Sequence, residues 1–104
     1  MSTRKKSDAL QLLEKLTGGP MTLGKFLEAV RLGEDLTQPE FAKKLRVSKS
    51  HLNDIEKGRK AVSPDRAARF AKTLGYSPER FVKLALQDLV DRSGLRFEVQ
   101  VKAS

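Results

Sequence analysis

The feature that most constrains the fold of this chain is a pair of short helices separated by a turn of only three residues. Thr37 begins the first helix with a capping box, which Glu40 completes three positions later. Ser48 begins the second helix, which is expected to run to about Lys57 and to stop at Gly58. A chain that turns so tightly packs its two helices directly against each other.

Similar start and stop signals divide the rest of the chain into further helices. Two Ser-Pro pairs each place proline at a first helical position, and glycine follows where each helical pattern ends. Thr22 caps a helix whose apolar residues recur on one face as far as Leu32, with Gly33 as the expected stop. We predict an all-α fold of five helices, at residues 22–32, 37–45, 48–57, 63–74 and 77–92. A short amphipathic helix over residues 7–16 is expected to precede them.

The hydrophobic period changes after Gly94. Apolar and polar residues alternate from Leu95 to Lys102, which is typical of a half-buried strand. A lone strand has unpaired backbone groups on both edges, so it needs a partner, either its own copy or another protein. We therefore predict a C-terminal β-strand over residues 95–101. The chain then has three parts: an N-terminal extension, a helical domain and a C-terminal tail, at residues 1–21, 22–92 and 93–104.

Positive charge is concentrated in the segment that contains the two short helices. The net charge of the chain is +8, and residues 37–60 carry seven Lys or Arg against three acids. Such a surface attracts polyanions, although a run of charge by itself is more often an ordinary solvated face. The charge alone does not decide the function.

Composition excludes several kinds of site. The chain has no cysteine, and its single histidine, His51, has no second histidine or thiol to complete a metal or catalytic site. Because there is also no glycine-rich phosphate loop, we expect no enzyme activity and no cofactor or metal. No apolar stretch is long enough for a signal peptide or a membrane span, so we expect a cytoplasmic protein without a membrane partner.

The segment from Leu36 to Gly58 resembles the helix-turn-helix of the XRE family, the class of Cro and the phage repressors. The residues that carry the resemblance are Thr37, Gln38, Phe41, Ala42, Leu45, Val47, Ser48, Leu52, Ile55, Glu56 and Gly58. Further residues match the packing pattern of the family's fourth helix: Ala67, Phe70, Ala71, Leu74 and Gly75. The resemblance covers about residues 22–90 and implies a five-helix, lambda-repressor-like DNA-binding domain. One departure is Arg46, where the family commonly has glycine at a turn position that often takes a positive φ.

The resemblance also implies which residues read DNA bases. In the family the second helix of the motif enters the major groove with its N-terminal end first. Carried over by position, Lys49 and Ser50 reach the base edges first, and Asn53 and Asp54 follow one turn later. Lysine suits guanine, asparagine suits adenine, and aspartate can accept from the cytosine amino group.

Other residues are expected to hold the DNA backbone or to stabilise the domain. The expected backbone contacts come from helix starts and from cations around the motif: Thr37, Gln38, Lys43, Ser48, Lys57, Arg59 and Lys60. The resemblance further implies a structural ion pair between Arg31 and Glu56, which would tie the first helix of the domain to the end of the recognition helix.

The implied function is a sequence-specific, double-stranded DNA-binding transcriptional repressor. The helix over residues 7–16 and the strand over residues 95–101 exceed a minimal DNA-binding domain, which favours an autoregulatory antitoxin of a type II, HigA-like toxin–antitoxin pair with a toxin partner. A stand-alone phage-type repressor is one alternative, and a protein-interaction module without DNA binding is another. Both extra segments could instead serve a homodimer.

A homodimer would read an inverted-repeat operator. The longest predicted helix has apolar residues on more than one stripe, which favours an interface there and on the strand. The expected interface residues are Phe81, Val82, Ala85, Leu86, Leu89, Val90, Leu95, Phe97, Val99 and Val101.

Overall fold

Five helices account for most of the chain that the structure, a computed structural model, describes, which is residues 21–104. They are α2 (Leu23–Gly33), α3 (Gln38–Leu45), α4 (Lys49–Glu56), α5 (Pro64–Leu74) and α6 (Pro78–Arg92). Each lies within about a turn of its predicted bounds, because the signals that define helix ends act over three or four residues. The helix predicted over residues 7–16 lies outside the described residues. None of the described helices is long and apolar enough to cross a membrane.

The helix starts show the predicted capping. The Thr37 hydroxyl accepts from the Glu40 amide at 3.3 Å, and Glu40 Oε1 accepts from the Thr37 amide at 2.9 Å, which confirms the capping box. The Ser48 hydroxyl accepts from the His51 amide at 3.0 Å. These bonds satisfy amides that the first helical turn leaves without partners, and they fix where α3 and α4 begin.

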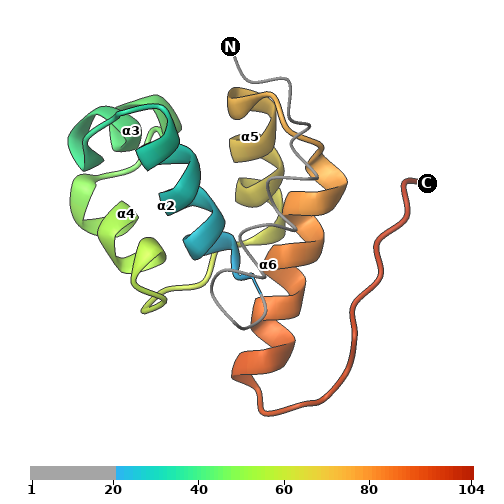
Figure 1. The fold of residues 1–104 in the computed structure, drawn as a ribbon. Coiled ribbons are helices and arrows are strands. Elements are labelled where there is room, and N and C mark those ends of the chain that lie inside the picture. Colours follow the sequence, from blue (N-terminus) through green and yellow to red (C-terminus); the bar gives the residue numbers. More distant parts are fainter. Residues whose placement is uncertain (1–20) are drawn as a thin grey trace.

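The hydrophobic core joins the two short helices to the rest of the domain. In Figure 1, α3 and α4 lie on one side of α2, and the long pair α5 and α6 lies on the other. Three aromatic rings pack on the α6 side, with the ring centroids of Phe26 and Tyr76 5.1 Å apart and those of Phe26 and Phe81 5.6 Å apart. Leu52 and Ile55 bury the inner face of α4. The packing holds α4 with one face inward and its opposite face toward solvent.

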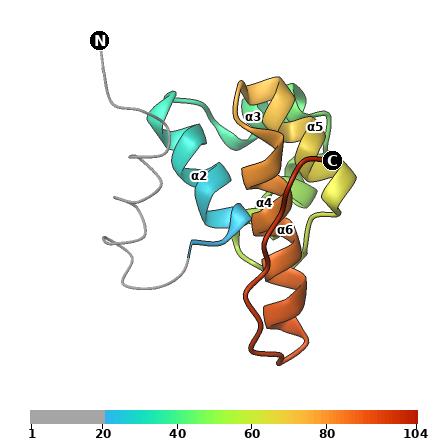
Figure 2. The same ribbon diagram turned by 90° about the vertical axis from the view of Figure 1, so that its right-hand side faces the viewer.

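The predicted C-terminal strand is wrong. Residues 95–101 form no strand, and no strand occurs anywhere in residues 21–104. The tail instead runs back along α6 (Figure 2). Gln87 Nε2 donates to the Phe97 carbonyl at 2.8 Å, and the Val99 amide donates to Gln87 Oε1 at 2.8 Å. A β-strand pairs its backbone groups with those of a neighbouring strand. Here the side-chain amide of Gln87 pairs with the Phe97 carbonyl and the Val99 amide instead.

The turn between α3 and α4 has the left-handed backbone that the family's glycine would supply. Arg46 has φ 60° and ψ 43°, so the arginine adopts the positive φ that is common at this turn position in the family. Asp35 is the other described non-glycine residue with positive φ, at 56°. Gly33 is the last residue of α2 and Glu34 is its C-cap, so the helix ends one residue later than predicted, and Asp35 rather than Gly33 takes the left-handed conformation.

We expect Arg46→Gly to stabilise the protein by about 0.5–1 kcal/mol, because glycine adopts this backbone without the Cβ clash that arginine suffers. Urea unfolding of the two proteins measures the difference. Asp35→Gly is the matched control, and its gain should be smaller, since aspartate tolerates the left-handed region better than arginine does. An Arg46→Gly protein no more stable than wild type would contradict the strain.

Candidate nucleic-acid interface

The leading turn of α4 is exposed to solvent. Ser48 caps the helix, and Lys49 and Ser50 are both exposed on its first turn. Leu52 and Ile55 are fully buried on the opposite face. The two residues expected to reach the bases first are thus held outward by the packing of the rest of the helix.

A buried ion pair fixes the far end of α4 against α2. Arg31 Nε donates to Glu56 Oε2 at 2.8 Å, and Arg31 Nη2 donates to Glu56 Oε1 at 3.0 Å. Arg31 Nη1 also donates to the Leu36 carbonyl at 3.1 Å. The Glu56 side chain is 0% exposed, and its hydrogen bonds raise the pKa of the Arg31 guanidinium. The pair implied by the resemblance is therefore present as a bidentate contact with little access to water.

The ion pair continues as a chain of hydrogen bonds to a predicted base-reading residue. Gln38 Nε2 donates to Glu56 Oε1 at 3.0 Å and to Asn53 Oδ1 at 3.1 Å. We call Arg31, Glu56, Gln38 and Asn53 the polar relay. Sequence reasoning placed Gln38 only at the DNA backbone, and its separation of 15 residues from Asn53 gave no local signal of the contact.

The polar relay determines which atoms Asn53 presents. Glu56 pairs with Arg31 as a carboxylate and can only accept, so the Gln38 group that faces it must be the NH₂. The same NH₂ then requires an acceptor from Asn53, which is its Oδ1. The Asn53 NH₂ is left to donate to a partner outside the protein. Guanine O6 and N7, adenine N7 and thymine O4 are the acceptors that such a group can meet in the major groove.

The cations that follow α4 form a loop around Asp54. Residues 57–60 are all exposed, and Gly58 has φ 77°. Asp54 Oδ1 lies 3.7 Å from Arg59 Nε, and Asp54 Oδ2 lies 3.7 Å from Lys60 Nζ. We call residues 57–60 the basic loop. Asp54, expected as a base contact, is thus engaged with two of the predicted backbone contacts.

The remaining predicted backbone contacts are all exposed residues on or beside α3 and α4. Lys43 is exposed on α3, and Lys57 is the exposed C-cap of α4. The hydroxyls of Thr37 and Ser48 already accept backbone amides as caps. A phosphate near these residues would be met by the amides of the helix start and by the lysines.

His51 is part of a cationic cluster beside α4. Arg66 Nη1 lies 3.1 Å from His51 Nε2, and because a guanidinium can only donate, the imidazole accepts through that nitrogen. Burial is the largest cause of a lowered His51 pKa, and the charges of Arg66 and Lys60 lower it further against the opposing effect of Asp54. The folded protein therefore favours neutral His51.

We expect stability to fall as the pH drops from about 7.5 to about 5.5, because the unfolded chain binds a proton on His51 near 6.5 while the folded chain resists it. The stability that comes from keeping His51 neutral is fully present above the pKa of the unfolded chain. It is lost as the pH falls through the lower pKa of the folded protein. Thermal unfolding of wild type and His51→Gln across this range measures the effect, since the variant cannot titrate there. Equal slopes for the two proteins would show that His51 does not contribute.

The predicted interface residues divide between the core and the surface. Phe81 and Ala85 lie in the core at 0% and 1% exposure, so they cannot belong to a partner surface. Three others are large and exposed: Leu89, Leu95 and Phe97. The rest are partly buried on α6 and the tail: Val82, Leu86, Val90, Val99 and Val101.

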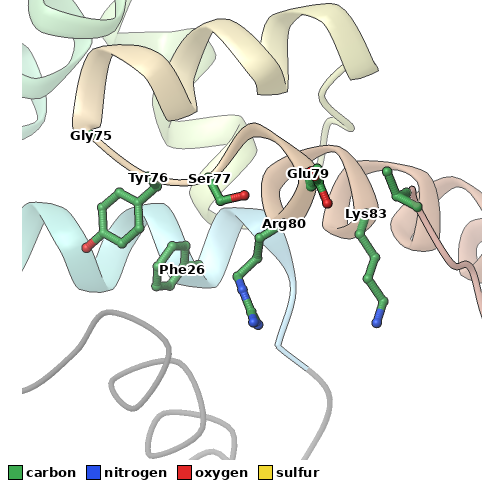
Figure 3. A pocket seen from close by; sticks show the side chains of 8 residues that line it. Phe26, Gly75, Tyr76, Ser77, Glu79, Arg80 and Lys83 are labelled. Carbon is green, nitrogen blue, oxygen red and sulfur yellow. The ribbon is translucent and has the colours of Figure 1, made fainter. Parts of the chain in front are cut away.

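A cavity of about 420 Å³ lies elsewhere on the surface, between α2 and the start of α6 (Figure 3). Phe26 and Tyr76 line its apolar side, and Arg80 and Lys83 extend from α6 beside them. Val101 of the tail also lines it. Because no residue of α3 or α4 lines the cavity, it is separate from the surface that carries Lys49, Asn53 and the basic loop.

Comparison with known proteins agrees with this geometry. The family model described as Helix-turn-helix matches residues 27–81, which is just over half of the chain and spans α3, α4 and α5. No curated protein and no solved structure matches the chain significantly. The chain belongs to the XRE-type helix-turn-helix family of DNA-binding transcriptional regulators.

Proposed function

We propose that this regulator is a repressor that reads an operator through the first two turns of α4. The observation that carries the proposal is the exposed leading turn with Lys49 and Ser50, beside an Asn53 whose orientation the polar relay fixes. Fixed donors lose less entropy on binding than freely rotating ones, so a preset Asn53 favours sequence reading over general attraction to DNA.

The basic loop supplies the complementary, sequence-independent contacts. Its cations, Lys57, Arg59 and Lys60, are all exposed and lie directly after the recognition helix. Cations placed beside a helix in the major groove meet the phosphates that flank it, and they set the position of the helix without reading sequence. Selection of bound duplexes from a random library tests the proposal as a whole, since it reports binding, preferred sequence and symmetry together.

The two groups of contacts should respond differently to substitution. Lys49→Ala and Asn53→Ala should relax sequence preference, with a loss of about 1–3 kcal/mol on the preferred site only. Arg59→Ala and Lys60→Ala should weaken binding to all duplexes. Each should also reduce the slope of log affinity against log salt concentration by about one. Lys102→Ala, on the tail, is the matched control for loss of one lysine. Equal effects of both groups on specificity would contradict this division.

We further propose that the protein acts as a homodimer on an inverted repeat. The exposed apolar residues of α6 and the tail support this, because Leu89, Leu95 and Phe97 are 41%, 50% and 66% exposed. Two domains joined there would place their recognition helices on half-sites about 34–36 Å apart. Light scattering at micromolar concentration tests the dimer, and a monomer together with an asymmetric selected site would refute it.

The same exposed residues support a second role as an autoregulatory antitoxin. In this role the apolar surface of α6 and the tail binds a toxin, and the complex represses its own operon through α4. Co-expression with the product of an adjacent reading frame, followed by purification, tests the role directly. A stable complex that binds the selected operator supports the antitoxin. Repression by the protein alone, with no partner recovered, supports a stand-alone phage-type repressor.

A further inference from the structure

Asp54 lies between two cations of the basic loop, Arg59 and Lys60, which are groups expected to hold DNA phosphates. Its two carboxylate oxygens each face a different cation, Arg59 Nε and Lys60 Nζ, at 3.7 Å. The backbone carbonyl of Asp54 also accepts from the amides of Arg59 and Lys60, at 2.8 and 3.3 Å. Arg59 and Lys60 therefore contact both the side-chain carboxylate and the backbone carbonyl of Asp54.

The ion pairs of Asp54 with Arg59 and Lys60 are loose enough for a DNA phosphate to compete for the two cations. A direct charge-assisted hydrogen bond from nitrogen to oxygen is about 2.7–2.9 Å long, so the separations of 3.7 Å reflect attraction of charge without a tight bond. The Arg59 and Lys60 side chains are more than half exposed, whereas Asp54 is 27% exposed. An incoming phosphate can reach both cations, but it must share them with a carboxylate that remains beside them.

We propose that Asp54 acts as an internal substitute for a DNA phosphate, which weakens binding to arbitrary duplexes and so raises the specificity of the protein. This inference rests on the proposed function of the basic loop. A duplex of any sequence gains less from Arg59 and Lys60 while Asp54 neutralises part of their charge, and its phosphates are repelled by the carboxylate. Only a site that offers Asp54 a donor, such as a cytosine amino group, offsets that repulsion.

The size of the effect follows from counterion release. Each phosphate neutralised contributes a slope of about −0.9 to the dependence of log affinity on log salt. Removing the Asp54 charge restores about one full cation to the loop. The affinity of Asp54→Asn for a random duplex should therefore rise about 5–10-fold near 0.1 M salt, with a slope steeper by about 0.9.

The experiment compares Asp54→Asn with Glu98→Gln, which changes the net charge equally at an exposed position on the tail. Each protein is titrated with a random duplex and with the operator obtained by selection, at several salt concentrations. We expect only Asp54→Asn to gain random-duplex affinity, and its ratio of operator to random affinity to fall. In an Arg59→Ala/Lys60→Ala background, Asp54→Asn should raise random-duplex affinity much less, because only the direct repulsion between the carboxylate and the phosphates is then removed.

The outcomes separate this inference from the proposed function. Random-duplex affinity that matches the Glu98→Gln control overturns the inference, as does a gain of undiminished size in the Arg59→Ala/Lys60→Ala background. Loss of operator affinity alone would make Asp54 a base contact only, which also overturns it. A wild-type protein that binds no duplex refutes the proposed function instead. Salt elution from heparin then still tests the masking of the cations, and equal elution of the two variants rejects it.

Discussion

Glu56→Ala is expected to destabilise the protein by about 3–5 kcal/mol, which is the cost of removing one partner from a buried ion pair. The Glu56 carboxylate is fully buried and accepts from Arg31 through two nitrogens and from Gln38 through a third. Without it, the Arg31 guanidinium, whose side chain is 12% exposed, is left with the Leu36 carbonyl as its hydrogen-bond acceptor within residues 21–104. Domains of this size are stable by about 5–15 kcal/mol, so the variant should be close to unfolding.

Urea unfolding followed by circular dichroism measures this loss. Glu34→Ala is the matched control, because it also removes a glutamate from an ion pair, with Lys44 at 3.5 Å, but the Glu34 side chain is 44% exposed. An exposed pair contributes about 0–1 kcal/mol, so the control should remain near wild type. Similar losses for Glu34→Ala and Glu56→Ala would refute the structural role of the buried pair.

The same substitution should impair DNA reading even under conditions where the protein is folded. Gln38 loses the carboxylate that fixes its amide orientation, so its NH₂ no longer has to face Asn53. Asn53 can then rotate and present either its oxygen or its NH₂ to a base. We expect the operator preference at the base that Asn53 meets to weaken, and titration of operator variants at that base measures it.

Gly24→Ala is expected to cost about 1–3 kcal/mol or more, because the added methyl group has no room. A Cβ on Gly24 would collide with the backbone carbonyl oxygen of Ile55 and would lie 3.5 Å from the Glu56 Cα. Backbone atoms cannot swing aside as a side chain can, so α2 and α4 would have to separate. That movement would also lengthen the Arg31–Glu56 contact, which joins the same two helices.

Gly33→Ala provides a control within the same helix. Nothing lies within 4 Å of a Cβ at Gly33, and alanine has the higher helix propensity, so this variant should be unchanged or more stable by up to about 1 kcal/mol. Thermal and urea unfolding of the two variants isolate the contact from the general effect of replacing glycine. If Gly24→Ala and Gly33→Ala have the same melting temperature and the same free energy of unfolding, α2 does not approach α4 as closely as the structure indicates.

The helix boundaries were predictable because their causes are local. A cap such as Ser48 and a left-handed residue such as Arg46 act on backbone groups within one turn. The exposure of Lys49 and Ser50 was predictable for a similar reason, since capping and the inward side chains of α4 together fix which face is exposed. Their role in reading bases was expected only from the resemblance. The resemblance to a known family added the expectation that this face binds DNA.

The contacts that couple helices were not predictable from local patterns. Gln38 and Glu56 are 18 residues apart, and Arg31 and Glu56 are 25 apart. The ion pair was expected only from resemblance, and the bond from Gln38 to Asn53 was not expected at all. Gly24 carried a weak signal, because a glycine inside a helix often marks a close approach of another backbone.

The sequence by itself determined where helices start and stop, and which side of α4 faces outward, because those properties depend on neighbours along the chain. Tertiary structure alone decided the orientation of Asn53 and the conformation of the tail. Alternation over residues 95–101 specified two faces but could not supply a backbone partner. The Gln87 side chain provides hydrogen-bond partners for this segment, so the segment lies along α6 without forming a strand.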